Sequence, residues 1–254
     1  MQISLQIQLA QVSAFLLALV RCGAWVSVCP PFGTKMVPVQ VKVGFSFALA
    51  LAVTPNLAKH PVPLELAPLL SSVVVQAGVG LALGFLGVLL FSAVQAAGSM
   101  IDLFGGFSTA QLFDPSTGAQ ASIFGRFYQL LATVLLFATG GHLLLVRGFL
   151  TTFDIVPAAP SLATMGHVFT GGLTTMFVAA LEIAAPLLAA LFLADLALGL
   201  LSKAAPEMNV FLLGFPLKIL LTLGLAGLAI PLLPGAVSTL VESIVTGGAR
   251  LVAG

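Results

Sequence analysis

The chain has 254 residues, of which 59% are hydrophobic and only 7% are charged, and its mean hydropathy is +1.18. A soluble domain ordinarily carries about 25% charged residues, so this composition is typical of a membrane protein. Nine Lys/Arg and eight Asp/Glu are scattered singly along the chain. They form no basic stripe that could neutralise phosphates, which argues against nucleic-acid binding.

The first apolar run, 1–20, is expected to form a retained helix. A signal peptide would carry basic residues before its apolar core, whereas the first basic residue here, Arg21, follows the run. Cys22 and Cys29 come next. On a helix they would lie about 10.5 Å apart along the axis, beyond the roughly 4.4–6.8 Å that separates the Cα atoms of a disulfide. We therefore expect two buried free thiols.

Longer charge-free runs follow at 66–101, 127–146, 155–181 and 219–241. Each reaches the ~20 apolar residues that a helix needs to cross the hydrocarbon core of a bilayer. Shorter apolar runs lie at 43–58 and 183–194. The runs are continuous rather than alternating, which argues against a transmembrane barrel. The sequence thus predicts an all-α, membrane-type fold with five to seven helices.

Several features are unusual for helices that contact only lipid. Small residues recur four positions apart at Gly80/Gly84, Ala185/Ala189 and Ala190/Ala194. Such spacing allows two helices to approach closely, within one chain or between subunits. Prolines interrupt the apolar runs at Pro186, Pro216, Pro231 and Pro234. Glu182 and Asp195 would each cost about 2.5–3.5 kcal/mol or more facing lipid, so some helices are expected to contact protein or water.

Two polar segments interrupt the apolar sequence. The first, 105–122, is rich in Gly, Ser, Thr and Gln and contains Asp114 followed by Pro115, which is typical of a surface loop. It is far longer than the usual connection of about 4–6 residues, and long loops are often functional. Both interpretations fit its composition. In the second segment, 202–209, Pro206 and Asn209 predict a turn between two helices.

The sequence lacks a catalytic or metal-binding pattern. None of the three histidines forms an i, i+4 pair beside a Glu, as a helical zinc site would require. Asp102 and Asp114 could be considered as an intramembrane aspartyl pair. A glycine-rich segment separates them, however, and Asp114 precedes Pro115, where a turn commonly begins. We expect neither enzymatic activity nor a bound cofactor or metal.

Four segments resemble the FliR family, the R subunit of the flagellar type III protein-export gate, which is related to the T subunit of virulence secretion systems. They are PPFGTKMVPVQVKVGFSFALALAVTP at 30–55, GSMIDLFGGFSTAQLFDPSTGAQASIFGRF at 98–127, GHLLLVRGFLTTFDIVP at 141–157 and LADLALGLLSKAAPEMNVFLLGFPLK at 193–218. The resemblance spans nearly the whole chain in the same order. The Gly141-His142 pair favours the flagellar branch.

The resemblance implies a non-enzymatic subunit of a channel for unfolded flagellar proteins. In that family one R subunit assembles with several P and Q subunits into a helical, tapering gate. The gate lies at the centre of the basal body in the bacterial inner membrane, in part above the membrane on the periplasmic side. The resemblance further implies a P-like helical part over 1–172 and a Q-like hairpin over 173–254.

The resemblance also implies roles for the two polar segments. It makes 105–122 a pore plug, with the residues Gly105, Gly106, Phe107, Leu112, Phe113, Asp114, Pro115 and Gly118. It places the second segment at the cytoplasmic mouth near the B subunit, with the residues Lys203, Pro206, Glu207, Met208, Asn209, Phe211 and Lys218.

The alternative function is a stand-alone multi-span transporter of small solutes. Broken helices together with intramembrane carboxylates, here Glu182 and Asp195, are typical of transporters. A gate subunit would be found in a large complex with smaller partners, whereas a transporter would remain a monomer or small homo-oligomer. An intramembrane hydrolase is a third possibility, against which the absence of a nucleophile–base arrangement argues.

Overall fold

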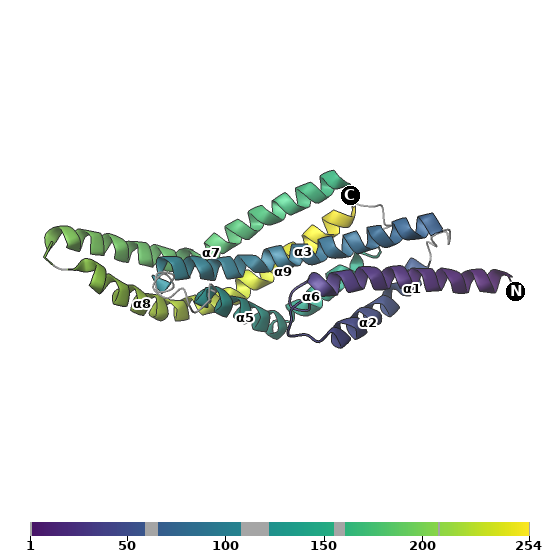
Figure 1. Ribbon diagram of the computed structural model, residues 1–254, viewed down its shortest axis with the longest axis horizontal. Coiled ribbons are helices and arrows are strands. Elements are labelled where there is room, and N and C mark those ends of the chain that lie inside the picture. Colours follow the sequence, from purple (N-terminus) through teal and green to yellow (C-terminus); the bar gives the residue numbers. More distant parts are fainter. Residues whose placement is uncertain (1, 59–65, 108–121, 155–160, 208, 254) are drawn as a thin grey trace. The chain divides into compact units, whose positions relative to one another are not determined.

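The computed structural model describes residues 2–58, 66–107, 122–154, 161–207 and 209–253 (Figure 1). Every element in these ranges is a helix, as the composition predicts. In chain order the elements are α1 (Gln2–Val28), α2 (Val39–Leu57), α3 (Leu66–Phe104), α5 (Ile123–Ala138), α6 (Gly141–Thr151), α7 (Leu162–Ala204), α8 (Val210–Ala229), the 3-10 helix η2 (Ile230–Leu232) and α9 (Leu233–Ala253).

The predicted number of helices was too low, because the described residues alone contain eight α-helices. Three local features explain the difference. The apolar run 219–241 is divided between α8 and α9 by the 3-10 helix η2, which contains Pro231. Helix α2 accommodates Pro55 near its end, so a short run that looked interrupted is helical. The apolar run 127–146 is divided between α5 and α6 by Gly140, whose φ of 75° lies in the left-handed region that favours glycine.

Four helical stretches among the described residues are long and apolar enough to cross a membrane. They are Ala10–Val28, Leu66–Phe104, Ala163–Ala204 and Leu213–Ala253. Helices α5 and α6 add a fifth candidate if this bent pair is counted as one span. The prediction of a membrane protein with several spans is therefore supported by helix length as well as by composition.

The helices pack into two compact units. Unit 1 comprises Met1–Leu90, Gly140–Leu173 and Val241–Gly254, and unit 2 comprises Phe91–Thr139 and Thr174–Leu240. Helices α3, α7 and α9 are each divided between the two units, with one part in unit 1 and the other in unit 2. The division into a P-like part, 1–172, and a Q-like hairpin, 173–254, concerns resemblance to other subunits rather than packing, and it stays a prediction.

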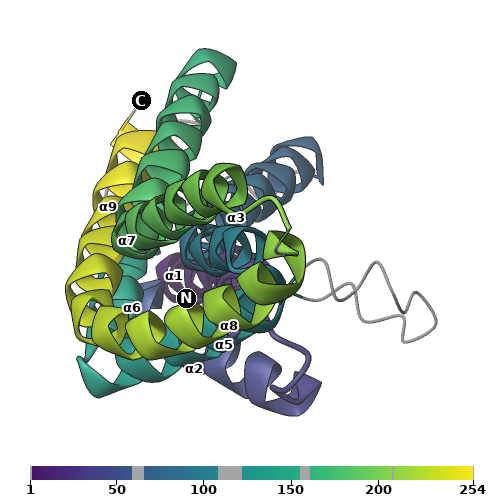
Figure 2. The same ribbon diagram turned by 90° about the vertical axis from the view of Figure 1, so that its left-hand side faces the viewer.

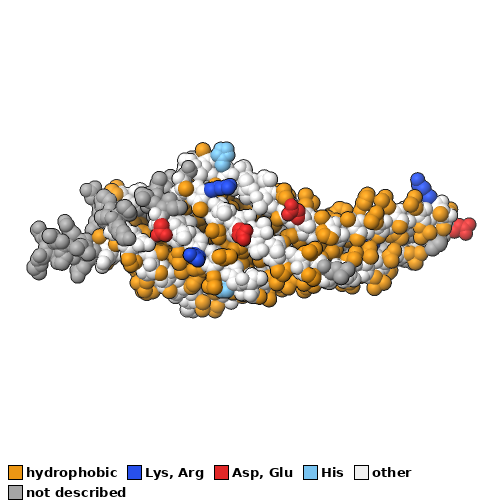
Figure 3. Space-filling view, turned by 180° about the vertical axis from the view of Figure 1, so that it is seen from behind, with side chains coloured by type: hydrophobic (Ala, Val, Ile, Leu, Met, Phe, Trp, Pro, Cys, Tyr) orange, Lys and Arg blue, Asp and Glu red, His pale blue; other side chains and the backbone are white. Residues whose placement is uncertain are grey.

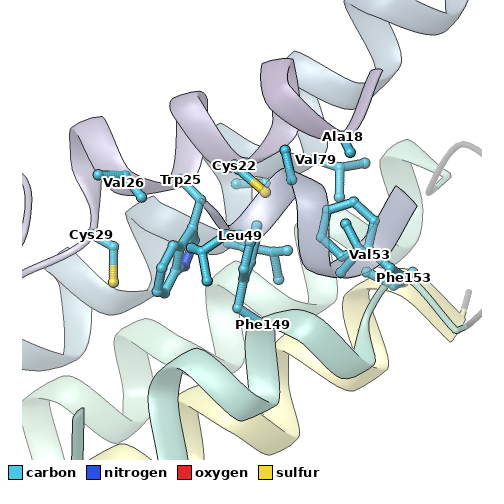
Figure 4. Close-up of a cluster of buried hydrophobic side chains, with 14 of the residues drawn as sticks. Ala18, Cys22, Trp25, Val26, Cys29, Leu49, Val53, Val79, Phe149 and Phe153 are labelled. Atoms are coloured by element: carbon cyan, nitrogen blue, oxygen red, sulfur yellow. The ribbon is translucent and has the colours of Figure 1, made fainter. Parts of the chain in front are cut away.

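The core of unit 1 is built from α1, α2, α6, the first part of α3 and the end of α9. Figure 4 shows Trp25 of α1 lying flat against Phe149 of α6, with their ring centroids 4.2 Å apart. Cys22 and Cys29 lie in the same cluster as free, buried thiols, which confirms the prediction. Helices α1 and α2 pack along each other and lie side by side in Figure 1.

The small residues at Gly80 and Gly84 serve packing inside unit 1. A Cβ at Gly80 would lie 2.5 Å from the carbonyl oxygen of Arg21, and one at Gly84 would lie 3.0 Å from Cβ of Val28. Glycine therefore allows α3 to seat α1 at close range. By contrast, Ala185 and Ala189 on α7 are exposed. The spacing left open whether these small residues pack within one chain or between subunits. The glycine pair packs within the chain, and this alanine pair does not.

In unit 2 the end of α7 and the start of α8 form an antiparallel hairpin. Figures 1 and 2 both show α8 running back alongside α7. Asp195 of α7 forms an ion pair with Lys218 of α8, and a Cβ at Gly214 would lie 3.3 Å from the side chain of Leu198. On the face shown in Figure 3 the hairpin, at the right of the view, is largely covered by hydrophobic side chains and carries charged ones at its turn.

Candidate functional site

The structure places the predicted plug residues only in part. Gly105, Gly106 and Phe107 are described, whereas Leu112, Phe113, Asp114, Pro115 and Gly118 lie outside the described residues. What the structure describes is where the segment 105–122 leaves α3 and where it joins α5. We call these two ends, residues 98–107 and 122–128 of unit 2, the neck.

A buried aspartate joins the two sides of the neck. Asp102, in the last turn of α3, is only 2% exposed. Its carboxylate accepts a hydrogen bond from the Ser122 hydroxyl, and the Phe124 amide N–H lies 3.0 Å from Oδ2 and 3.2 Å from Oδ1. The α5 N-terminus carries unpaired amides and a partial positive charge, so a carboxylate there is stabilising.

Ser122 completes the cap of α5. As the N-cap residue it accepts a hydrogen bond from the Gly125 amide through Oγ, at 2.8 Å. Serine is among the residues that N-cap positions favour, because its oxygen pairs with an amide of the first turn. The same hydroxyl therefore accepts from its own helix and donates to Asp102 of α3. The cap of α5 is shared between residues twenty positions apart.

Glycine allows the two helices to approach at this point. A Cβ at Gly98 would lie 2.5 Å from the Phe124 carbonyl oxygen and 2.6 Å from Cα of Gly125. Contacts below about 3 Å would force the backbones apart, so only glycine at 98 keeps α3 this close to α5. The carboxylate of Asp102 then accepts a direct hydrogen bond from the Phe124 amide in the first turn of α5.

Gly105 and Gly106, the first two residues of the predicted plug, have different roles in the structure. Gly105 is buried against α8, where a Cβ would lie 2.7 Å from Thr222 Oγ1, so its small size serves packing. Gly106 has a φ of 85°, a left-handed conformation that often follows the end of a helix and that glycine adopts without strain. The neck, which contains the end of α3 and the start of α5, thus also contacts α8 of unit 2.

Aromatic side chains line the neck on the α5 side. Phe107 packs edge-on against Phe124, with ring centroids 5.3 Å apart, and Phe124 packs edge-on against Tyr128. Phe124 and Tyr128 are buried. Edge-to-face pairs of this kind add about 0.5–1.5 kcal/mol beyond burial of their area. Phe107, the first apolar residue of the predicted plug, is thus anchored to the base of α5.

The second polar segment forms the predicted turn. Helix α7 ends at Ala204, Pro206 and Glu207 lie in an exposed turn, and α8 begins at Val210, with Phe211 as its second residue. Lys203 and Asn209 are exposed on either side, and Met208 lies outside the described residues. Lys218 is further from the turn, about 12 Å along α8, and is paired with Asp195.

Asp102 is the site residue whose role sequence reasoning missed. It was considered there only as half of a catalytic pair. A carboxylate in the last turn of a helix is unfavourable next to that helix's own negative end, and this mismatch was the signal that it had a partner elsewhere. Among the described residues, no group of three or more His, Cys, Asp or Glu could hold a metal ion.

Comparison with known proteins identifies similar chains over most of this length. Residues 12–244 match the model of the family described as bacterial export proteins, family 1. The flagellar biosynthetic protein FliR of Bacillus subtilis is 36% identical, over 81% of this chain and 82% of the relative. FliR of Escherichia coli is 31% identical, over 92% and 90%. The Yop proteins translocation protein T of Yersinia pestis is 29% identical, over 71% of each chain.

Proposed function

Because this chain belongs to the FliR family of bacterial export proteins, we propose that it is a core subunit of the flagellar type III protein-export gate. In this proposal it helps to form and seal the channel for unfolded flagellar proteins. The observation that carries the proposal is the match over 12–244, which includes both polar segments. The family consists of export proteins rather than enzymes, which confirms the expectation that this chain has no enzymatic activity.

The proposed location is the bacterial inner membrane at the flagellar basal body, with part of the assembled gate displaced toward the periplasm. The several candidate spans support a membrane location. Asp195 is neutralised by Lys218 within the hairpin, so this carboxylate has a partner without a transported solute. The structure therefore offers less support for a stand-alone transporter than the sequence did.

The proposed partners are the P and Q subunits of the gate, with the B subunit at the cytoplasmic mouth. Support comes from α7, where Glu182, Ala185 and Ala189 are exposed beside Leu181 and Pro186. A carboxylate facing lipid is costly, and exposed small residues permit close approach of a second helix. This face is therefore better suited to a protein partner than to lipid. The division into P-like and Q-like parts belongs to the same proposal.

In this proposal the segment 105–122 is the plug of the resting channel. A pore wide enough for an unfolded polypeptide would leak ions unless something occluded it. The segment carries apolar residues that could fill a pore, at Phe107, Leu112 and Phe113. The end of α3 and the start of α5, between which the segment lies, are joined by hydrogen bonds at the neck. A plug needs such a fixed point of attachment.

Producing the chain with and without the proposed P and Q subunits tests the assembly. We expect the three to co-purify in one large complex after gentle solubilisation, and we expect this chain to resist heating better there than alone. The reason is the area of apolar and small-residue surface on α7 that the single chain leaves exposed. A single chain that is monodisperse and equally heat-stable when produced alone would contradict the proposal.

A cysteine at the hairpin turn tests the proposed cytoplasmic mouth. Asn209→Cys introduces a thiol at an exposed position, while the native Cys22 and Cys29 are completely buried. We expect a membrane-impermeant maleimide to label the variant only when the cytoplasmic side is accessible, as in inverted vesicles. Opened membranes provide the control for reactivity, and the parent chain provides the background. Labelling of intact cells from the periplasmic side would place the turn on the opposite side.

A further inference from the structure

The hairpin of α7 and α8 carries very few charges along its length. Asp195 is the only charged residue of 183–202, and Lys218 is the only one of 208–241. These two side chains form an ion pair with each other across the hairpin. Each helix thus has one charge within its apolar run, and the other helix neutralises it.

Charged residues also mark the two ends of the apolar part of α7. The helix between Glu182 and Lys203 is about 31 Å long at 1.5 Å per residue, and the hydrocarbon core of a bilayer is about 30 Å thick. Asp195 lies about 12 Å from Lys203 along the helix. The charges at the ends of this stretch are therefore spaced by one hydrocarbon thickness, and the ion pair lies between them.

The outward surface of the hairpin is apolar between these ends. Leu193 and Leu196 of α7 are exposed, as are Leu217 and Leu220 of α8. Leu193 is 64% exposed and Leu220 is 69% exposed. On the face shown in Figure 3, hydrophobic side chains cover the hairpin and charged ones stand at its turn. Contact of such a surface with water is unfavourable, whereas contact with hydrocarbon is not.

We propose that the hydrocarbon core of the membrane covers this surface, at 192–201 and 213–223, and that the Asp195–Lys218 pair allows the hairpin to enter it. The two helices then cross the layer as one unit that carries no net charge between Glu182 and the turn. The inference goes beyond the export role, and it holds whether or not any segment of the chain closes a channel.

The surroundings of the hairpin decide what the ion pair contributes. A lone charge near the centre of a bilayer is strongly unfavourable, and a pair in a low-dielectric environment that loses one member leaves an uncompensated charge. In water the same pair would contribute little, because exposed ion pairs are screened. The side chains of Lys218 and Asp195 are 22% and 42% exposed, so the medium around the hairpin reaches both. Lipid and water therefore predict opposite results when one member is replaced.

Spin labelling identifies what covers the hairpin. Leu193→Cys and Leu220→Cys each carry a nitroxide about 15 Å from the turn, in proteoliposomes that contain the chain with the subunits that co-purify with it. The native Cys22 and Cys29 are buried and stay unlabelled. We expect strong relaxation by oxygen, which concentrates in hydrocarbon, and weak relaxation by a water-soluble nickel chelate. Asn209→Cys, at the exposed turn, is the aqueous reference.

Two other results of this measurement would overturn the inference. Strong relaxation by the nickel chelate at both leucine positions would show that water covers the hairpin. Weak relaxation by oxygen and by the chelate alike would show that a protein partner covers it. Neither result bears on co-purification with the proposed P and Q subunits, so failure of this inference and failure of the proposed gate are told apart.

Substitutions at the ion pair test its role in the layer. Lys218→Met leaves a lone carboxylate, which shifts the equilibrium against the inserted hairpin by roughly a hundredfold or more. We therefore expect less chain in the membrane fraction and, in the chain that remains, a Leu220 label open to the chelate. Asp195→Asn leaves a lysine whose long side chain can extend toward the headgroups, so we expect a smaller loss. Lys203→Met makes the same change at the exposed lysine beside the turn and is the matched control.

Two double variants separate charge pairing from general damage. Asp195→Asn with Lys218→Met removes both charges, and Asp195→Lys with Lys218→Asp exchanges them. We expect both to be close to wild type in membrane content and in the relaxation of the Leu220 label. A Lys218→Met chain that matches Lys203→Met in both measurements would show that the pair is not needed in the layer. Double variants as impaired as Lys218→Met would show that these residues do not act by neutralising each other.

Discussion

Deleting residues 107–117 is expected to leave the gate assembled and to make cells that overproduce it permeable to small ions and dyes. The deletion removes Phe107, Leu112 and Phe113, the apolar bulk of the proposed plug, together with the turn at Asp114 and Pro115. An open path for an unfolded chain would admit ions continuously. Dye entry and ion flux, compared with wild type at equal amounts of assembled complex, measure the effect, which we expect to be several-fold.

Assembly is expected to survive because the neck stays intact. After the deletion Gly106 is joined to Gly118, and 118–121 remain to reach Ser122. Four residues can span up to about 14 Å, while Asp102 near the end of α3 is hydrogen-bonded to Ser122 directly. The shortened connection is therefore long enough, and among the described residues the deletion removes the ring contact of Phe107 with Phe124.

A matched variant separates chain length from apolar bulk. Replacing Phe107, Leu112 and Phe113 by Ser keeps the segment at full length and removes its large apolar side chains. We expect a leak between those of wild type and the deletion, because a polar loop can occupy a pore but cannot exclude water from it. An intact barrier in the deletion strain would make 105–122 an ordinary connecting loop.

The sequence was informative about features that depend on neighbouring residues. Continuous apolar runs predicted helices, and the spacing of Cys22 and Cys29 predicted free thiols, because both follow from the geometry of one helix. Pro206 and Asn209 predicted the turn between α7 and α8, because turn preferences also depend on a few neighbouring residues. Helix boundaries were less certain, since the conformation of Gly140 decides where one apolar run divides in two.

Features that depend on contacts between distant residues could not be predicted. The cap of α5 uses Asp102, and the pairing of Asp195 with Lys218 depends on how two long helices align. Gly80 and Gly84 had the right spacing for close packing, but only the structure shows that α1 fills that space. The spacing of apolar residues along the sequence indicates which face of a helix is apolar. It does not indicate which other helix covers that face.

Arg21→Ala is expected to cause a large loss of stability in unit 1. Arg21 lies in the apolar helix α1 and is 2% exposed. Its guanidinium lies over the ring of Phe153, 4.3 Å from the centroid, and donates to the carbonyl of Thr152, the C-cap residue of α6, at 3.3 Å. A cation at a helix C-terminus is favourable, and among the described residues no carboxylate forms an ion pair with it. Alanine removes these contacts and leaves a cavity.

The physical terms set the size of the effect and the controls. Leaving the buried Thr152 carbonyl unpaired costs about 1–3 kcal/mol, and losing a desolvated cation–π contact costs about 2 kcal/mol. Arg21→Met keeps most of the side-chain volume and removes the buried guanidinium, whose Nε atom has no hydrogen-bond partner among the described residues. We therefore expect a smaller loss of stability than in Arg21→Ala. Arg147→Ala makes the same change at an exposed position of α6 and should be nearly neutral. The fraction of complex that survives a heating series ranks wild type and the three variants by stability. An Arg21→Ala protein as heat-stable as Arg147→Ala would show that the buried guanidinium does not hold α1 to the end of α6.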